Sequence, residues 1–349
     1  MRAKIKIFLA GYVDYINAQN LNCLALANYL DDDKFEILTL SLNSKYKQDL
    51  NFRIFYCIKP YFFSKYIGFL WGILNSDICY FPKHIDTPLW ILKFARLINR
   101  PIFTTLEGNV MDRSKDNLVD LFGSLDNMLR HFSFFNKVFP ITKHISSQVE
   151  NCFPNISTLL HLGVDYDSFF YDRNINKLKK IAFVGGLIKR KRVEQMVDLA
   201  LLFPNLYFEI IGDGDYREEL MSKSPKNVFF RGRLSQIELK EAFKTVDLLF
   251  LPSVSEGFPK VILEAACASI PSVVYGSYGA DEWIKHNING FVVSEFNDVV
   301  NLINNLLSCP SLIQSTSKNT SKLAYAFDWK KIILKWEKEI LFMISNNEK

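Results

Sequence analysis

The sequence predicts an α/β protein of two Rossmann-like, doubly wound domains with parallel sheets. Short apolar runs alternate with segments of helical periodicity, which is the pattern of strands joined by crossover helices. Several of these runs end in glycine-containing loops, where such sheets bind their ligands. The chain has 349 residues, and at roughly 150 residues per domain this length indicates about two domains.

In the first half, the predicted strands and helices follow one another in order. The strands are Lys4–Ala10, Glu36–Leu42, Asp77–Phe81 and Ile102–Leu106, and the helices are Leu21–Leu30 and Leu89–Ile98. The first apolar run is short, contains Lys6 and is followed by Asp14, so we interpret it as a strand and not as a signal peptide.

The second half repeats this alternation. Its strands are Ile181–Val184, Leu206–Ile211, Val228–Arg231, Asp247–Leu251 and Ser272–Tyr275, and its helices are Val193–Leu202, Tyr216–Met221 and Pro259–Ala268. Ser235, with Glu238 three residues later, is a capping-box signature for one further helix.

A polar stretch, Asp172–Lys180, separates the two halves. It predicts a first domain of residues 1–172 and a second domain of residues 173–325. The tail Trp329–Ile344 carries apolar residues at helical spacing and is expected to form a long amphipathic helix. Ligands are expected at the carboxyl ends of the strands, in a cleft where the two domains face each other.

Composition excludes several classes of protein. Hydrophobic residues make up 49% and charged residues 23% of the chain, which is typical of a globular protein. The six cysteines include no C-x-x-C pair and the five histidines show no ligand spacing, so we expect reduced thiols and no zinc site. No uncharged stretch offers the about 20 apolar residues of a membrane span. A cytoplasmic protein is expected.

The charge is mildly basic. Forty-two Lys and Arg against 37 Asp and Glu give a formal charge of +5, which argues against nucleic acid as a partner. Such a charge suits an anionic small molecule or an anionic membrane surface.

The first motif of chemical interest is VGGLIKRKR, residues 184–192. A strand ends, Gly185 and Gly186 let the backbone approach a ligand, and four cations that include Arg190 and Lys191 precede a helix. Exposed amides, a helix N-terminus and cations together favour a phosphate group. The alternative interpretation is a solvated basic turn.

The second motif is SVSEGFPKVILE, residues 253–264. Pro259 favours the first helical turn, and the amides of Lys260 and Val261 then offer a second anion site at the positive end of the helix dipole. Glu256 can accept hydrogen bonds from sugar hydroxyls, and Glu264 can accept them from a ribose. Alternatively, both carboxylates only stabilise the helix start.

These two motifs carry a resemblance to a known family. EGFPKVILEA, with Glu256 and Glu264 bracketing seven residues, resembles the E-x7-E signature of retaining glycosyltransferases of the GT-B fold, family 4. Further segments resemble the family in the same order: HLGVDYDSFF, FVGGLIKRKRVEQMV, IIGDGDYREEL, VFFRGRLSQIELKEAF, VDLLFLPS, IPSVVYGSYGADEWI and NINGFVV. The first half of the chain matches only in layout.

The resemblance implies roles for particular residues. Glu256 would contact the donor sugar, Glu264 the nucleotide ribose, and Arg233 with Leu234 the region of the base. The donor diphosphate would be held by Gly185, Gly186, Arg190, Lys191, Gly257, Phe258, Pro259, Lys260 and Val261. It also implies that residues 326–349 form a helix returning to the first domain. No metal or other cofactor is implied, because cations and helix dipoles neutralise the leaving diphosphate. The D-x-D strings (Asp31/Asp33, Asp165/Asp167 and Asp213/Asp215) are interpreted as capping or turn residues.

The chain departs from the family at two positions. Gly186 stands where the family has Arg, and Arg190 or Arg192 is the expected substitute. Glu107 stands where the family has a His near the cleft. A carboxylate accepts rather than donates hydrogen bonds, so Glu107 is expected to accept from the acceptor hydroxyl and to act as a base.

The acceptor side is expected in the first domain. Gly11, Asn17, Gln19 and Asn20 lie in the first strand–helix loop and are candidates for lining an acceptor pocket, unless this is an ordinary polar loop. Aromatic residues alternate with cations in 59–81 and 129–139, which suits a surface on anionic lipid. Burial of these aromatic side chains in helix faces is the alternative.

The sequence therefore predicts a cytoplasmic, membrane-peripheral transferase. It would move a sugar from a nucleotide diphosphate donor, UDP-sugar or GDP-sugar, to a hydroxyl of a glycan, with retention. A lipid-linked glycan and surface polysaccharide synthesis of the bacterial type are expected. The alternatives are an epimerase or hydrolase of nucleotide sugars on the same fold, and a non-catalytic nucleotide-sugar-binding subunit.

Overall fold

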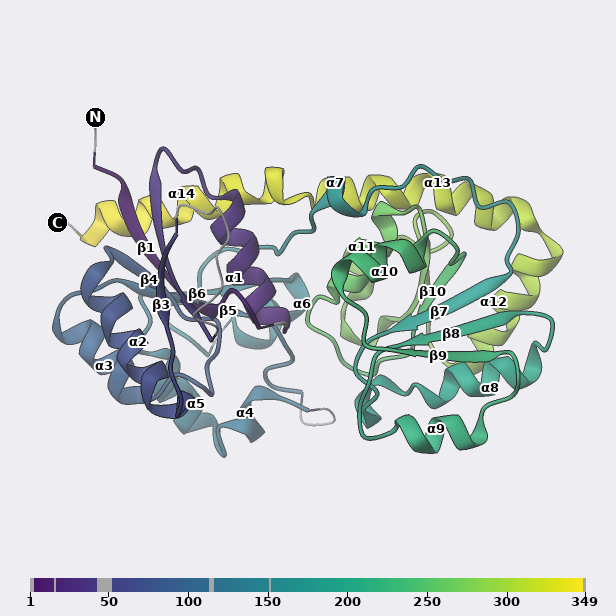
Figure 1. Ribbon diagram of the computed structural model, residues 1–349, viewed down its shortest axis with the longest axis horizontal. Coiled ribbons are helices and arrows are strands. Elements are labelled where there is room, and N and C mark those ends of the chain that lie inside the picture. Colours follow the sequence, from purple (N-terminus) through teal and green to yellow (C-terminus); the bar gives the residue numbers. More distant parts are fainter. Residues whose placement is uncertain (1–2, 16, 43–51, 113–115, 151, 348–349) are drawn as a thin grey trace. The chain divides into compact units, whose positions relative to one another are not determined.

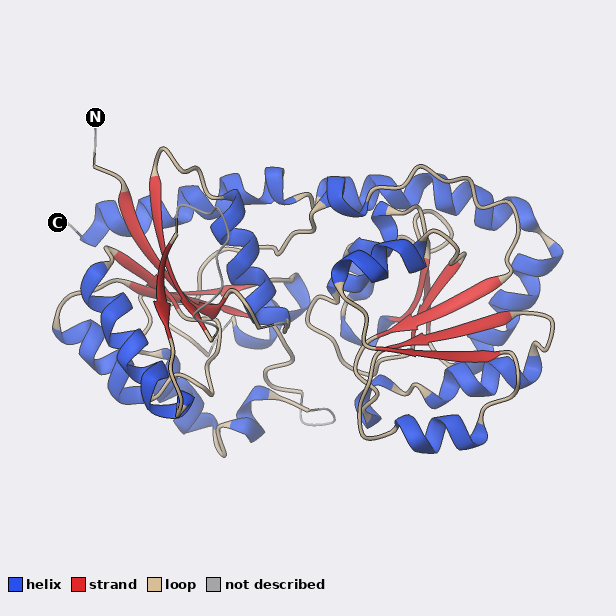
Figure 2. Cartoon of the chain, in the orientation of Figure 1, coloured by secondary structure: helices blue, strands red, loops and turns tan. Residues whose placement is uncertain are grey.

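The chain forms two compact α/β units (Figures 1 and 2). The computed structural model describes residues 3–15, 17–42, 52–112, 116–150 and 152–347. Unit 1 consists of Met1–Arg113, Asn117–Leu162 and Trp329–Lys349, and unit 2 of Ser114–Asp116 and Gly163–Asp328. The predicted fold class, with a parallel sheet and flanking helices in each half, is confirmed.

Unit 1 is built on a six-stranded parallel sheet in the order β3-β2-β1-β4-β5-β6. Its strands are β1 (Ile5–Tyr12), β2 (Phe35–Ser41), β3 (Arg53–Tyr56), β4 (Ile78–Tyr80), β5 (Ile102–Leu106) and β6 (Lys137–Pro140). Its helices are α1 (Ala18–Tyr29), α2 (Tyr61–Asn75), α3 (Leu89–Leu97), α4 (Leu118–Leu121), α5 (Leu125–Phe132), α6 (Lys143–Val149) and α14 (Trp329–Asn347).

Both faces of this sheet are covered by aromatic packing. On one face, Phe8 of β1 lies edge to face against Phe69 of α2, with 6.4 Å between ring centroids. On the other face, Tyr80 of β4 packs against Trp336 of α14 at 5.4 Å. Because successive residues of a strand point to opposite faces, the adjacent Phe81 joins the α2 side instead, 5.5 Å from Phe69. The last helix of the chain is thus part of the first unit (Figure 1).

Unit 2 repeats the design with a six-stranded parallel sheet in the order β12-β11-β10-β7-β8-β9. Its strands are β7 (Lys180–Val184), β8 (Tyr207–Ile211), β9 (Val228–Gly232), β10 (Leu248–Leu251), β11 (Ser272–Tyr275) and β12 (Phe291–Val293). Its helices are α7 (Tyr166–Phe169), α8 (Glu194–Leu202), α9 (Arg217–Lys223), α10 (Gln236–Phe243), α11 (Lys260–Cys267), α12 (Phe296–Ser308) and α13 (Pro310–Ala326). Three 3-10 turns are Lys189–Lys191, Gly276–Tyr278 and Ala280–Glu282.

The unit boundaries fall at 162/163 and 328/329, whereas the polar stretch predicted 172/173 and the predicted second domain ended at residue 325. The difference has a physical reason. Phe169 of α7 is buried and lies 6.3 Å from the ring of Phe243 in unit 2. Val164 forms a β-bridge with Asp328, so the chain enters and leaves unit 2 at the same place.

The aromatic side chains of the two segments 59–81 and 129–139 differ in their burial. Phe132, Phe135 and Phe139 are buried, so the expected lipid surface at 129–139 is wrong and these side chains belong to the core. In α2 the outcome is mixed, because Phe69 is buried while Phe62 and Phe63 are 62% and 66% exposed. Among the described residues, no helix is both long and apolar enough to cross a membrane.

Candidate functional site

Two loops of unit 2 meet beyond the carboxyl ends of β7 and β10. The loop after β7 carries the basic 3-10 turn Lys189–Lys191, and the loop after β10 carries Glu256. The N–H of Val254 donates to the carbonyl of Arg190 at 3.1 Å, and the Arg190 guanidinium donates to the carbonyl of Ser255. The two motifs singled out in the sequence, 65 residues apart, thus form one continuous surface.

Glycine is required where the loop after β7 packs against the loop after β8. Gly212, after β8, has a φ of +138°, and a Cβ there would lie 1.8 Å from the carbonyl oxygen of Gly185. Gly185 itself has a φ of +156°. Gly186 is exposed, and a Cβ on it would meet no atom within 4 Å. The loop is therefore held by tight backbone packing at Gly185 and is open at Gly186.

The centre of this surface is an ion cluster. The Lys191 Nζ donates to Glu256 Oε1, and the Arg190 guanidinium lies 3.6 Å from the same oxygen. The side chains of Lys191 and Glu256 are only 14% and 9% exposed, so the pair is poorly screened by water. Arg190 and Arg192 were expected to take the role of the family's arginine at the position of Gly186. Arg190 contacts the loop of Glu256, and Arg192 is exposed.

The loop after β10 leads into the N-terminus of α11. Pro259 is the N-cap residue and the helix begins at Lys260, one residue later than predicted. Phe258 is buried, with its ring 5.2 Å from Trp283 and 5.2 Å from Phe327. This aromatic packing fixes the backbone just before the helix, so the first amides of α11 have a defined direction. Sequence reasoning missed both partners of Phe258, because they lie far along the chain.

Glu264 lies in the second turn of α11 and is partly buried. Burial raises the pKa of its carboxyl to about 7, against the charge of Lys260 and a hydrogen bond with Gln236, which both lower it. Gln236 is the first residue of α10 and lies within the capping box of Ser235 and Glu238, which the structure confirms. Leu234 and the exposed Arg233 immediately precede that box. The second glutamate is thus linked to the segment expected beside the base.

Glu107 lies in unit 1, just after β5, and its carboxylate is held by three side chains. Asn22 Nδ2 donates to Oε2 at 2.9 Å, and Thr105 Oγ1 donates to Oε1 at 2.9 Å. The hydroxyl of Tyr80 lies 2.6 Å from Thr105 Oγ1 and 3.3 Å from Glu107 Oε1. Asn22, Tyr80 and Thr105 are fully buried. None was predicted, because they come from α1, β4 and β5 and no local motif joins them.

The predicted acceptor-side residues have structural partners. Asn17 is the N-cap of α1 and accepts from the N–H of Asn20 at 2.8 Å. Asn20 is 1% exposed; its Oδ1 accepts from Tyr12 N at 3.1 Å, and its Nδ2 donates to the Tyr15 carbonyl at 2.7 Å. A Cβ on Gly11 would lie 2.7 Å from Cys23 Sγ. These contacts shape the loop, and an acceptor contact by these residues stays a prediction.

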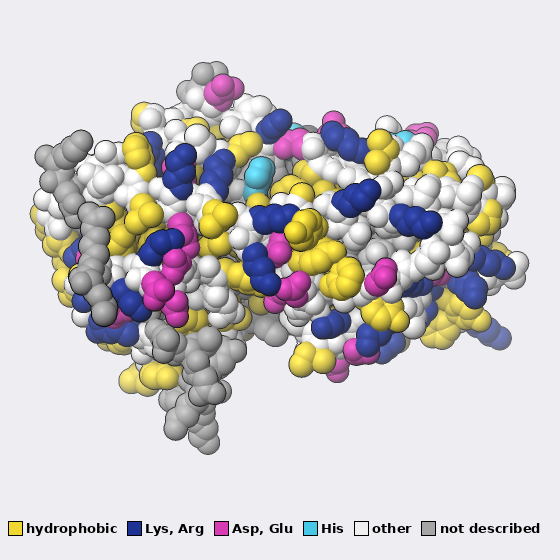
Figure 3. All heavy atoms as spheres, turned by 90° about the horizontal axis from the view of Figure 1, so that it is seen from above, with side chains coloured by type: hydrophobic (Ala, Val, Ile, Leu, Met, Phe, Trp, Pro, Cys, Tyr) yellow, Lys and Arg dark blue, Asp and Glu magenta, His cyan; other side chains and the backbone are white. Residues whose placement is uncertain are grey.

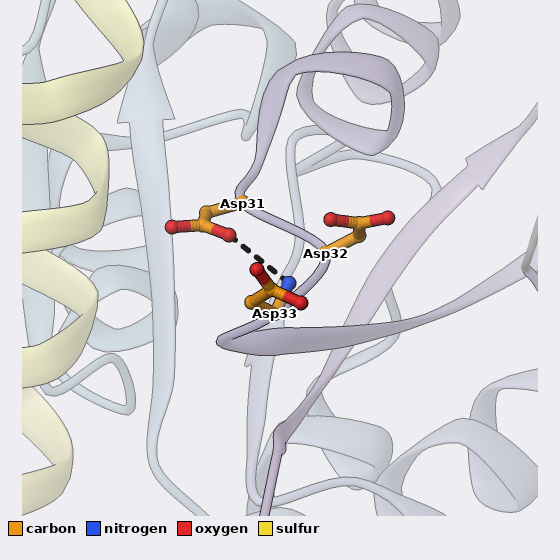
Figure 4. A group of neighbouring side chains, drawn as sticks. All are labelled: Asp31, Asp32 and Asp33. Carbon is orange, nitrogen blue, oxygen red and sulfur yellow. Dashed lines mark hydrogen bonds between the residues drawn. The ribbon is translucent and has the colours of Figure 1, made fainter.

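The acidic strings behave as turn and cap residues. Asp31, Asp32 and Asp33 come together in the turn between α1 and β2 (Figure 4), with carboxylate oxygens within 4.8 Å of one another. Asp31 accepts from the N–H of Asp33 at 3.0 Å and pairs with Lys34 at 2.7 Å, and hydrogen bonding to Lys34 lowers its pKa. Asp165 caps α7, and Asp213 accepts from the N–H of Gly214. In these contacts the aspartate side chains accept hydrogen bonds from nearby backbone N–H groups and so stabilise turns and a helix start.

Comparisons with known proteins agree with this arrangement. Residues 167–323 match the family model described as glycosyl transferases group 1. An uncharacterized glycosyltransferase of Methanocaldococcus jannaschii is 25% identical over 93% of this chain and 94% of its own length. The UDP-Gal:alpha-D-GlcNAc-diphosphoundecaprenol alpha-1,3-galactosyltransferase of Escherichia coli is 31% identical over 30% of this chain and 28% of its own length.

The fold also matches solved structures. The HepE protein of Anabaena, solved in complex with UDP and glucose, aligns with a TM-score of 0.78 and 17% identity over 96% of this chain and 99% of its own. The sucrose-phosphate synthase of Thermosynechococcus elongatus aligns with a TM-score of 0.82 and 14% identity over 98% and 100%. Residues 167–323 of the chain are thus similar to group 1 glycosyl transferases, and both units share the GT-B fold of the solved structures.

Proposed function

We propose that the protein transfers a sugar from a nucleotide diphosphate donor to a hydroxyl of a glycan, with retention of configuration and without a metal ion. The observation that carries this proposal is the contact of Lys191 with Glu256 beside the N-terminus of α11. The two loops together thus offer a cation and helix amides for a diphosphate, with a carboxylate next to them for the sugar. Glu264, eight residues further, is assigned to the ribose.

Donor binding requires an exchange of partners in the ion cluster. In the unliganded chain, Lys191 is paired with Glu256. A diphosphate that binds Lys191 and the α11 amides replaces the carboxylate as the partner of this cation. Glu256 is then available to accept hydrogen bonds from the sugar hydroxyls. In the transfer step, the bond from the anomeric carbon to the diphosphate oxygen breaks, and a bond to the acceptor oxygen forms on the same face. The acceptor proton passes to the departing diphosphate oxygen.

UDP-sugar is the favoured donor, with GDP-sugar as the alternative. The HepE structure contains UDP, and the E. coli relative is named for UDP-Gal. That relative acts on a diphosphoundecaprenol-linked sugar, and another, 34% identical over 25% of this chain, is an alpha-galactosylglucosyldiacylglycerol synthase of Streptococcus pneumoniae. These names support a lipid-linked acceptor in surface polysaccharide or glycolipid synthesis. We place the enzyme at the inner face of the cytoplasmic membrane, which suits its six free cysteines.

A thermal-shift panel of UDP-, GDP-, ADP- and CMP-sugars tests donor binding directly. A ligand at 100 times its Kd stabilises the fold by about 2.7 kcal/mol, so the preferred donor should raise the melting temperature clearly. Failure of all four classes to bind would contradict the proposal and favour a subunit without this activity. Nucleotide release that is as fast without a glycan acceptor as with one would instead indicate a hydrolase or epimerase of the donor.

A further inference from the structure

Helix α2 of unit 1 is apolar on the side that faces away from the sheet. Its inner side buries Ser64, Gly68, Phe69, Gly72 and Ile73, at the spacing of one helix face. On its other sides the exposed large residues are Tyr61, Phe62, Phe63, Ile67 and Leu74, with exposed fractions of 39% to 66%. A helix that is apolar all round is normally buried on all sides. The outer side of α2 therefore has no partner in the described structure that accounts for its composition.

The apolar surface extends beyond α2. Ile58, just before the helix, is 70% exposed, and Trp90 at the start of α3 is 48% exposed. Ring contacts connect these elements: Phe62 lies 5.0 Å from Tyr66, and Tyr66 lies 5.7 Å from Trp90, between ring centroids. We call Ile58, Tyr61, Phe62, Phe63, Ile67 and Trp90 the α2–α3 patch.

The segment that carries this patch is strongly basic. Residues 58–100 contain six Lys and Arg and two Asp, a net charge of +4 in a chain whose total is +5. Both acids are neutralised locally: Asp77 lies 3.9 Å from Arg100, and Asp86 lies 3.7 Å from Lys65. Lys59, Lys93 and Arg96 are exposed, and no described residue forms an ion pair with any of the three.

Figure 3 shows the molecule from above, where basic side chains are scattered among acidic and uncharged ones. The net charge of +4 in residues 58–100 accompanies the exposed aromatic rings of the same segment. Aromatic residues flanked by cations are typical of surfaces that bind the interface of an anionic bilayer, where rings insert between headgroups and cations neutralise phosphate.

We propose that the α2–α3 patch attaches the protein to an anionic membrane surface. Phe62, Phe63 and Trp90 insert into the headgroup region, and Lys59, Lys93 and Arg96 bind lipid phosphate. The purpose of this attachment, access to a lipid-linked acceptor, rests on the proposed function. The surface itself is defined independently of the donor loops.

Vesicle co-sedimentation without donor tests this surface. The full chain is mixed with vesicles of phosphatidylcholine alone or of phosphatidylcholine with phosphatidylglycerol. The wild-type chain should bind the anionic vesicles, and Phe62→Ser with Phe63→Ser should weaken partitioning by at least about tenfold, because two aromatic rings no longer leave water. Replacing Lys59, Lys93 and Arg96 with Gln should weaken binding to the anionic vesicles only and reduce its salt dependence.

The matched control is Ile237→Ser with Leu334→Ser, which removes two side chains that are 78% and 65% exposed outside the patch. It should bind vesicles like the wild-type chain, and all variants should keep the wild-type melting temperature. Absence of vesicle binding by the wild-type chain, or equal binding by the Phe variant, overturns the proposal. A wild-type dimer that the Phe variant converts to a monomer also overturns it, because a second copy then covers the patch. None of these results depends on the nucleotide-sugar panel.

Discussion

At the scale of single residues, the proposed donor site combines charged side chains with partial burial. Glu256 is paired with Lys191, whereas burial acts on Glu264 to disfavour its charged form. The carboxyl of Glu264 therefore takes up a proton near pH 7. This protonation makes the ribose-binding role of Glu264 testable through pH.

Glu264→Gln should weaken donor binding by about ten- to a hundredfold, because a hydrogen bond to a carboxylate contributes roughly 1.5–3 kcal/mol. In the wild-type chain, donor affinity should fall as pH decreases through about 7, where the carboxyl of Glu264 takes up a proton. The variant should lose this pH dependence. Titration calorimetry with the preferred donor at several pH values measures both effects, and an unchanged affinity would exclude the ribose role.

Stability provides the control for this variant. The pKa of Glu264 is higher in the folded chain than its ordinary value of 4.5. The folded state thus retains the proton to higher pH, and this residue's contribution to stability decreases as pH rises from 4.5 to about 7. Glu264→Gln should therefore melt no lower than the wild-type chain at pH 8. A large loss of stability there would show that the carboxylate is needed for folding instead.

At the scale of elements, glycine residues decide how closely a helix can approach its sheet. Gly72 of α2 lies over Phe8 of β1, and a Cβ on Gly72 would come within 2.4 Å of the Phe8 ring. Gly72 is on the buried side of α2, and Phe62, Phe63 and Ile67 of the α2–α3 patch are exposed on its other sides. An alanine at position 72 would thus gain helix propensity but would clash with the Phe8 ring.

Gly72→Ala should destabilise the protein by roughly 1–3 kcal/mol from overpacking, which exceeds the about 1 kcal/mol that alanine gains by helix propensity. Urea denaturation measures the net free energy of unfolding. Gly108→Ala is the matched control, because a Cβ on Gly108 meets no atom within 4 Å. A stabilised Gly72→Ala variant would mean that Phe8 moves aside at little cost.

At the scale of the whole molecule, the chain returns to its first unit after completing the second. Trp336 of α14 is fully buried, and its Nε1 donates to the carbonyl of His161 at 2.9 Å. Glu337 accepts from the N–H of Asp31 at 3.0 Å, so α14 also binds the turn after α1. The final helix therefore completes the core of unit 1, which a chain ending at Asp328 would leave open.

Trp336→Ala should cost roughly 3–5 kcal/mol of stability, as expected for deleting a large buried aromatic side chain. The loss should appear in unit 1: hydrogen exchange should increase in β4 and β5, which pack against Trp336, and stay unchanged in β7 and β10. Leu334→Ala, on the exposed side of the same helix, should change stability by no more than about 0.5 kcal/mol. Equal loss of protection in both units would contradict this assignment.

The sequence by itself determined the fold class, most strand positions and the two loops of the proposed donor site. These depend on hydrophobic periodicity and on glycine, proline and charge within about ten residues, which a linear pattern records. It placed β5 and β11 at their observed bounds and the capping box at Ser235. It did not indicate β3, β6 or β12, which are short.

The tertiary structure alone decided which side chains meet across long separations and which apolar residues remain exposed. It brought Asn22, Tyr80 and Thr105 to Glu107 and paired Lys191 with Glu256. It also buried Phe132 while leaving Phe62 exposed, although both lie in aromatic segments flanked by cations. The physical reason is that burial depends on which neighbours the whole fold supplies, and a local pattern of residues does not contain that information.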